Sequence, residues 1–94
     1  MAVEFDPDKD AANIAKHGVS LARAADFEIL AFVEDDRSAY GETRFRAWGL
    51  IDAMAHCLVF FTRRGGMVRA ISLRRAHKKE MDRYVAKNRS KNRD

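Results

Sequence analysis

The sequence predicts an α+β domain in which two N-terminal helices precede a three- to four-stranded antiparallel sheet and a C-terminal helix. In the first part of the chain apolar residues recur at helical spacing, whereas from residue 43 they alternate with polar residues as in strands. Gly65 and Gly66 separate two alternating stretches and permit the tight turn of a β-hairpin. The 94 residues allow one core, so we expect one domain over residues 1–88 and a polar, disordered tail at 89–94.

The first helix is predicted to begin after Asp6 and to end at Gly18. Asp6 can accept hydrogen bonds from free backbone amides, Pro7 suits the first helical position, and Gly18 suits a left-handed C-terminal residue. Ser20 is then expected to cap a second helix. The apolar stripe of that second helix would consist of Leu21, Ala24, Ala25 and Ile29.

The sheet is predicted to be an antiparallel meander. Residues 43–51 form a strand with one face on the core, and residues 54–63 form a strand that is apolar on both faces and therefore central. Residues 67–73 return after the glycine turn, and residues 31–34 add a brief extended segment. The last helix is expected from residue 76 to about 88. Its inward side would carry Met81, Tyr84 and Val85.

Charge is distributed very unevenly along the chain. Residues 1–62 hold 6 Lys/Arg and 11 Asp/Glu, a net −5, whereas residues 63–94 hold 12 and 3, a net +9. A strongly basic C-terminal third favours a polyanionic partner, most simply nucleic acid, because phosphate contacts dominate that kind of affinity. The alternative is a solvated basic helix followed by a disordered tail.

Composition also limits the classes of protein. The apolar run at residues 57–61 is far shorter than the roughly 20 residues of a membrane helix, so no membrane association is expected. The N-terminal residues lack the layout of a secretory signal, which predicts a cytoplasmic protein. The one cysteine, Cys57, cannot form an intramolecular disulfide, and its apolar neighbours favour a buried, inert thiol.

Arginines are concentrated in and around the predicted hairpin and suggest an anion site, because a guanidinium group suits bidentate contact with phosphate. They are Arg63, Arg64, Arg69, Arg74 and Arg75. Strict alternation places Arg69 and Arg74 on opposite faces of their strand, so at least one should need a partner or a pocket. The alternative for either one is an ion pair with an acid of the N-terminal segments, such as Asp26 or Glu28.

His17 is the candidate for proton transfer, because an imidazole can donate or accept a proton near neutral pH. It shares a helix face with Asn13 and lies where the first helix ends. The alternative is a capping or dipole role at the helix C-terminus. His56 and His77 are weaker candidates, and the wide separation of the histidines predicts no metal site.

Trp48 shares its predicted strand face with Arg44 and Arg46. Such an arrangement can stack a nucleobase beside phosphate-binding groups. The alternative is a tryptophan that belongs to the core or to a protein interface.

Several short motifs, in a shared order and spacing, resemble those of a known family. In chain order they are Glu4-Phe5-Asp6, Lys9, Asn13, Lys16-His17-Gly18-Val19-Ser20-Leu21, Gly41-Glu42-Thr43-Arg44-Phe45, Gly49, Thr62, Arg64-Gly65-Gly66, Arg69, Ile71-Ser72-Leu73-Arg74-Arg75-Ala76, Glu80 and Tyr84. Together they resemble the BrnT toxin family of bacterial type II toxin-antitoxin modules. The chain departs from the family pattern at Phe5, where a tryptophan is common, and at Arg63, where an acid is usual.

The resemblance implies a RelE-like fold and metal-independent endoribonucleolytic cleavage of RNA that inhibits translation, with no cofactor. It also implies a cognate ribbon-helix-helix antitoxin of the BrnA type, bound in a hetero-oligomer, so that DNA is contacted only through the antitoxin. The catalytic candidates are then His17, Glu42, Arg64 and Arg74. The RNA-binding candidates are Lys9, Lys16, Arg44, Arg69 and Trp48. A non-catalytic basic module that binds nucleic acid or an acidic protein is the alternative function.

Overall fold

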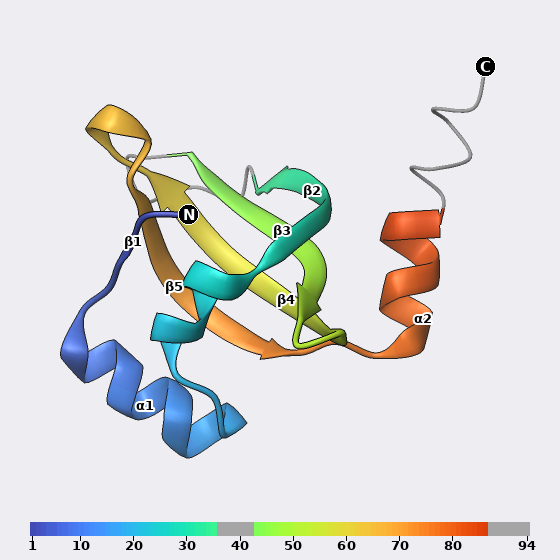
Figure 1. Cartoon of the computed structure of the whole chain (residues 1–94), viewed down its shortest axis with the longest axis horizontal. Helices are drawn as coiled ribbons and strands as arrows, with labels where there is room; N and C mark the ends of the chain where they lie inside the picture. The colour runs from blue at the N-terminus through green and yellow to red at the C-terminus, as the bar shows by residue number, and fades with distance from the viewer. Residues whose placement is uncertain (36–42, 87–94) are drawn as a thin grey trace.

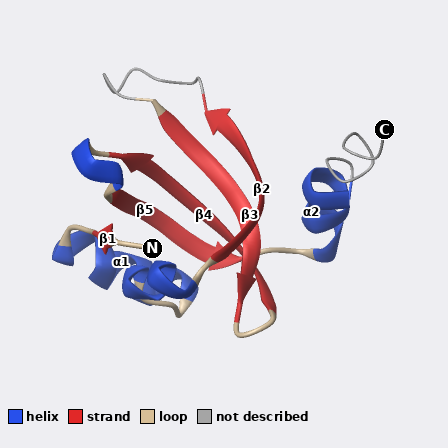
Figure 2. Ribbon diagram, turned by 45° about the horizontal axis from the view of Figure 1, so that its top comes forward, coloured by secondary structure: helices blue, strands red, loops and turns tan. Residues whose placement is uncertain are grey.

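The computed structural model describes residues 1–35 and 43–86. A five-stranded mixed sheet forms the centre, and helical segments lie on its two sides (Figure 1 and Figure 2). The elements in chain order are β1 (Val3–Glu4), α1 (Pro7–His17), the 3-10 helix η1 (Leu21–Asp26), β2 (Glu28–Asp35), β3 (Arg44–Ile51), β4 (Met54–Thr62), the short 3-10 turn η2 (Arg64–Gly66), β5 (Val68–Arg75), α2 (Lys78–Met81) and the π-helical η3 (Asp82–Ala86). No helix in these two described ranges is long and apolar enough to cross a membrane.

The strand order is β1-β5-β4-β3-β2. Strands β2 to β5 form the predicted antiparallel meander, and β4 occupies the middle of the sheet as its apolar faces predicted. The predicted number of three to four strands is wrong, because β1 adds a fifth strand parallel to β5. Two residues are too short for a periodic signal, so this strand is defined by its partner.

Helix α1 has the predicted ends. The Asp6 side chain accepts a hydrogen bond from the backbone N–H of Asp8 at 2.8 Å, and Gly18 closes the helix with φ of 73°. The predicted second helix is wrong beyond its first turns, because the chain forms only η1 and then enters β2 at Glu28. Ile29 therefore belongs to a strand. The apolar residues of this segment are compatible with a helix and with a strand. Pairing with β3 in the sheet stabilises the strand.

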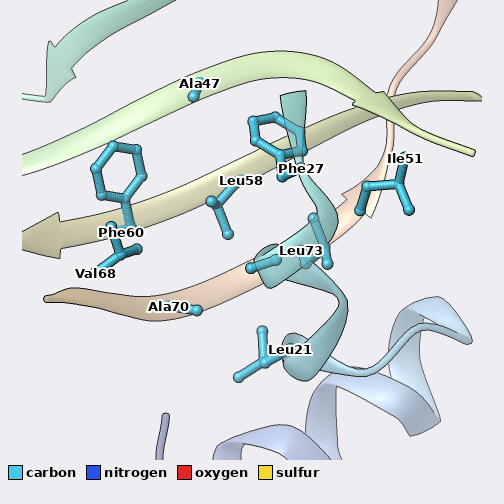
Figure 3. Close-up of a cluster of buried hydrophobic side chains, with 10 residues drawn as sticks. Leu21, Phe27, Ala47, Ile51, Leu58, Phe60, Val68, Ala70 and Leu73 are labelled. Atoms are coloured by element: carbon cyan, nitrogen blue, oxygen red, sulfur yellow. The ribbon is translucent and has the colours of Figure 1, made fainter. Parts of the chain in front are cut away.

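One face of the sheet, here called the α1 face, is covered by α1 and η1. Leu21 of η1 packs there with Ala47, Leu58 and Leu73 of the sheet, and all four are fully buried. Figure 3 shows these side chains converging from η1 and the strands. The predicted alternation in β3 is confirmed, because Ala47 and its neighbours of the same parity face this core.

Strand β5 contains a bulge that changes which side chains share a face. Val59 of β4 lies opposite Ser72 of β5. The next residue of β4, Phe60, lies opposite Ala70, which leaves Ile71 as an extra residue. The alternation of side chains between the two faces of the sheet is therefore shifted by one residue at Ile71.

The bulge corrects the predicted placement of Arg69 and Arg74. Val68, Ala70 and Leu73 all reach the core on the α1 face, although strict alternation would separate Leu73 from the other two. Arg69 and Arg74 are thus both directed to the opposite side of the sheet, called the α2 face. The prediction of opposite faces is wrong because one unpaired residue resets the period of two.

The α2 face is covered at one end by α2 and η3. Val85 packs there on Ala31, Trp48 and Cys57, with Met81 and Tyr84 at the edge of the cluster. The inward side predicted for the last helix, formed by Met81, Tyr84 and Val85, is confirmed. The predicted end of this helix near residue 88 and the predicted tail lie outside the described residues.

Two turns use backbone conformations with positive φ. Gly65 and Gly66, at 78° and 79°, form the predicted glycine turn between β4 and β5. The turn between β3 and β4 has Asp52 at 51° and Ala53 at 64°, although neither is a glycine. Positive φ at both central residues is typical of a type I′ hairpin, and it costs an alanine some strain.

Candidate active site

A cavity of about 430 Å³, here called the α1 pocket, lies where the C-terminal end of α1 meets the β3–β4 turn and the end of β5. Its polar lining consists of His17, Ser20, Arg23, Asp52, His56 and Arg75. Such a volume lies in the range of small-ligand sites. The pocket combines imidazole and guanidinium groups from three parts of the chain that are distant in sequence, namely the segment from α1 to η1, β4 and β5.

The wall that carries His17 is fixed by side chains of α1. Asn13 is 6% exposed, and its Nδ2 donates to the carbonyl oxygens of Val19 and Leu73, both at 2.8 Å. Its Oδ1 accepts from the backbone N–H of Leu73 at 3.2 Å. Asn13 therefore ties both α1 and the loop after it to β5, two residues before Arg75.

The loop after α1 has a second attachment. Asp10 Oδ1 accepts hydrogen bonds from Ser20 Oγ at 3.0 Å and from the backbone N–H of Leu21 at 2.7 Å. Ser20 in turn caps η1 by accepting from Ala22 N–H, as predicted for this serine. The carboxylate of Asp10 thus holds the loop close to the helix, and His17 is presented from a rigid support.

His56 is the second imidazole of the pocket and is 4% exposed. Its Nδ1 lies 2.8 Å from the carbonyl oxygen of Met54. A carbonyl oxygen can only accept, so Nδ1 donates a proton to it, and in the neutral form of the ring the lone pair is then on Nε2. His56 is therefore held in the tautomer that suits a general base.

Arg75 supplies an exposed positive charge at the pocket. It lies directly opposite His56 in the β4–β5 ladder and is exposed. Among the described residues, no carboxylate forms an ion pair with Arg75. Arg23 differs, because it is paired with Asp52 and Asp26. Arg75 is the better placed of the two to bind an anion.

The neighbouring residue, Arg74, has a different environment. Its Nη1 and Nη2 donate to the two carboxylate oxygens of Glu80, each at 2.8 Å. Glu80 also accepts from the backbone N–H of His77 at 3.1 Å. The hydrogen bonds from Arg74 lower the pKa of Glu80 to about 2, and the same pairing raises the pKa of Arg74. The partner is thus an acid of the last helix, and not Asp26 or Glu28.

Trp48 belongs to the same cluster and is 1% exposed. Its indole N–H donates to Glu80 at 3.1 Å, and its ring stacks on Tyr84 with centroids 3.7 Å apart at 5°. The guanidinium of Arg46 lies 5.6 Å from the centroid of the Trp48 ring. Trp48 therefore follows the core alternative, because its faces are taken by protein groups and leave no room for a nucleobase.

Arg69 lies at the other end of β5. Glu4 Oε1 is 3.6 Å from Arg69 Nη1 and 3.2 Å from Arg63 Nη1. Arg63, which departs from the family pattern, is thus half of an ion pair with the first strand. Arg64 is exposed at the β4–β5 turn and lines a hollow of about 460 Å³ together with Glu4, Arg63 and Met67.

The structure distributes the nominated residues over several places. His17 lines the α1 pocket, Arg74 and Trp48 lie under α2, and Arg64 and Arg69 lie near the β4–β5 turn. The others are placed as follows: Lys9 and Lys16 are exposed on α1, Arg44 lies opposite Asp35 on β3, and Glu42 falls outside the described residues. Of the nominated set, His17 is the one that lines the α1 pocket.

Sequence reasoning did not nominate His56, Arg23 or Arg75 for this pocket. His56 and Arg75 are 19 positions apart but meet as cross-strand partners. The separation of two residues in the sequence does not predict such a cross-strand pair, because the register of β4 and β5 depends on the bulge. The family motif that contains Arg74 and Arg75 was the available signal, and it did not distinguish the two arginines.

The fold and the pocket together define a small α+β protein with a cationic, imidazole-bearing cavity. The family model for the ribonuclease toxin BrnT of type II toxin-antitoxin systems matches residues 5–80. The chain therefore belongs to the BrnT family of ribonuclease toxins, and membership implies an RNA target and a cognate antitoxin. This confirms the resemblance inferred from the motifs.

A solved relative supports the assignment. The crystal structure of the Brucella abortus ribonuclease toxin BrnT matches with a TM-score of 0.62 and 25% sequence identity, and the match covers 83% of this chain and 99% of that one. No curated protein matches the chain. The α+β architecture with a C-terminal helix is thus common to this chain and its solved relative.

Proposed function

We propose that this protein is a metal-independent endoribonuclease that cleaves RNA in the α1 pocket and so inhibits translation in the cytoplasm. The observation that carries the proposal is the meeting of His17, His56 and Arg75 around one cavity. Acid, base and charge-stabilising group are all side chains of the protein, which is sufficient for transfer of a phosphoryl group to a 2′-hydroxyl. No group of three or more His, Cys, Asp or Glu within the described residues could hold a metal ion.

The proposed reaction assigns each group one task. His56 Nε2 takes the proton of the ribose 2′-hydroxyl as its oxygen attacks the adjacent phosphorus. Arg75 stabilises the negative charge that develops on the phosphoryl oxygens. The bond from phosphorus to the 5′-oxygen breaks, and protonated His17 donates a proton to that oxygen. The products are a 2′,3′-cyclic phosphate and a 5′-hydroxyl end.

The nominated residues outside the pocket have supporting tasks in this proposal. Arg64, Arg69 and Arg44 would bind flanking phosphates, together with Lys9 and Lys16 of the exposed α1 surface. Arg74 and Trp48 would act indirectly by holding α2 to the sheet. The partner that neutralises the toxin is proposed to be a ribbon-helix-helix antitoxin in a hetero-oligomer, with operator DNA bound through the antitoxin.

The test is RNA cleavage in the presence of EDTA, followed by chemical identification of the new ends. We expect 2′,3′-cyclic phosphate ends, and His17→Ala or His56→Ala should each lower the rate by about 100-fold or more. His77→Gln is the matched control, because this exposed histidine is the N-cap residue of α2 and does not line the pocket. Cleavage that persists in both alanine variants, or that stops when EDTA is added, would reject the proposal.

A second candidate function is binding of RNA or of an acidic protein without catalysis. The charge asymmetry, −5 for residues 1–62 and +9 for residues 63–94, favours it equally and needs no proton transfer. The same assay separates the two functions, because a binding module retains RNA on the protein while every molecule stays intact.

A further inference from the structure

A second hollow, of about 290 Å³ and here called the α2 hollow, opens on the α2 face between β3 and the last helix. Arg46 of β3 forms one side, and Lys79, Glu80, Arg83 and Tyr84 form the other. Lys79 and Arg83 are four residues apart and so project from one side of the helix. Three cationic side chains therefore surround one small space.

The acid in the hollow does not neutralise these three cations. Both oxygens of Glu80 are already bound, one by Arg74 Nη1 and the other by Arg74 Nη2 and the indole N–H of Trp48. Within the described residues, no carboxylate forms an ion pair with Arg46, Lys79 or Arg83. The hollow thus keeps an excess of positive charge.

Arg46 gives an independent indication of a missing ligand. Its Nε is buried and has no hydrogen-bond partner among the described residues. A buried donor without an acceptor is costly, and a shift of the Arg46 side chain onto an anion in the hollow would give this donor an acceptor. The guanidinium is also held in place by the Trp48 ring beneath it, which reduces the entropy lost when an anion binds.

We propose that the α2 hollow is a phosphate subsite that binds a backbone phosphodiester of the RNA, away from the cleavage centre. This inference rests on the proposed function for the identity of the ligand. Two guanidinium forks and an ammonium group match the oxygens of a phosphodiester better than those of scattered protein carboxylates, because the three cations line one small hollow. The stacked pair of Trp48 and Tyr84 anchors the helix that supplies two of the three.

The position of the hollow relates it to the α1 pocket. Arg75 lines the pocket, while the preceding residue, Arg74, binds Glu80 on the lining of the hollow. Consecutive residues of a strand point to opposite faces, so the two sites open on opposite faces at the same end of β5. An RNA strand that occupies both sites passes over this end of the sheet, where β5 continues into α2.

Trp48 provides a direct readout, because it is the one tryptophan of the sequence and touches the hollow through Arg46 and Tyr84. The probe is a single-stranded DNA oligonucleotide of about 12 nucleotides, which lacks the 2′-hydroxyl and cannot be cleaved by the proposed reaction. We expect saturable change in Trp48 fluorescence. Lys79→Gln and Arg83→Gln should each weaken binding about fivefold and reduce the slope of log affinity against log salt by about 0.7.

Lys78→Gln is the matched control, because Lys78 is exposed on the same helix and does not line the hollow. Equal affinities and slopes for the Lys78, Lys79 and Arg83 variants would overturn the subsite. Inorganic phosphate is the second probe and distinguishes free phosphate from a nucleic acid backbone as the ligand. If phosphate saturates the hollow and the oligonucleotide cannot displace it, the assignment to a nucleic acid backbone would be overturned.

Poly-glutamate is the third probe. Tighter binding of poly-glutamate than of the oligonucleotide, with the same dependence on Lys79 and Arg83, would show an acidic protein ligand and reject the proposal. Failure of the proposed function has a different signature. In that case RNA stays intact, while the oligonucleotide still binds with the predicted dependence on Lys79 and Arg83.

Discussion

The α1 pocket and the α2 hollow lie on opposite faces at one end of the same sheet, yet they hold arginine in different ways. In the pocket, Arg75 is exposed beside His56 and is not paired with a described acid. Across the strand, Arg74 donates two hydrogen bonds to Glu80 and helps to fasten α2. Two adjacent arginines of one motif therefore have separate tasks, one toward a ligand and one toward the fold.

The sharpest test of this difference compares Arg75→Gln with Arg74→Gln. Loss of Arg75 should lower RNA cleavage by about 100-fold or more, because it removes charge stabilisation in the transition state, and it should leave the melting temperature nearly unchanged. Loss of Arg74 should instead reduce the free energy of unfolding by about 1 kcal/mol, since the pair is partly exposed.

Initial rates and urea denaturation of both variants provide the measurement. The comparison breaks if the two substitutions reduce cleavage equally while both proteins remain folded. It also breaks if Arg75→Gln unfolds the protein, because the residue would then be structural.

A second prediction concerns the support of the α1 pocket. Asn13→Ala should lower the free energy of unfolding by about 2 to 3 kcal/mol, because it leaves the buried backbone groups of Leu73 without partners. Urea denaturation measures the loss. Ile14→Ala on the same helix is the control, since Ile14 is exposed and its truncation should have little effect. A similar loss in both variants would show that general helix destabilisation, and not the link to β5, is responsible.

The α2 side should show the stronger response to acid. The pKa of Glu80 falls from about 4.5 in the unfolded chain to about 2 in the folded protein, mainly through its hydrogen bonds with Arg74. A depressed pKa stabilises the folded state above about pH 4.5, and this contribution disappears as the pH falls toward 2. Glu80→Gln should therefore lose less stability than the parent protein between pH 5 and pH 3.

Denaturation curves at the two pH values measure this effect. Glu4→Gln is the control, because Glu4 also pairs with arginines but lies at the other end of β5. Parallel losses of stability in the parent protein and in Glu80→Gln would contradict the assignment to this carboxylate.

The smallest expected effect is a gain in stability beside the α1 pocket. Ala53→Gly should raise the free energy of unfolding by up to about 1 kcal/mol, because Ala53 has φ of 64° and glycine adopts such angles freely. Thermal unfolding measures the gain. Asp52→Gly relieves the same kind of strain but removes the partner of Arg23, so it should gain less. An equal gain in both variants would mean that the Arg23 to Asp52 pair contributes nothing.

Much of the architecture followed from local signals in the sequence. Asp6 and Gly18 marked the ends of α1, and Gly65 and Gly66 marked the turn before β5, because capping and positive φ depend on the residue itself. The chain after η1 was mistaken for a helix. There the same apolar residues suit either structure, and the pairing with β3 decides.

The candidate site was less accessible to sequence reasoning. His17 was found because an imidazole at a helix end is a local feature, whereas His56 and Arg75 meet only through the register of β4 and β5. Trp48 was given a base-stacking role as one interpretation, and the core alternative holds because Tyr84 covers it. Contacts that depend on strand register and on a bulge cannot be predicted from local patterns in the sequence.

The place of Cys57 has a consequence for observing this protein at work. Its thiol is 2% exposed between Trp48 and Val85, and burial raises its pKa above the usual value. A thiol reagent can therefore reach the sulfur only in molecules in which the cluster around Cys57 has opened, by local or global unfolding. Because the sequence contains no other cysteine, the rate of labelling measures that opening with a probe that the protein already carries.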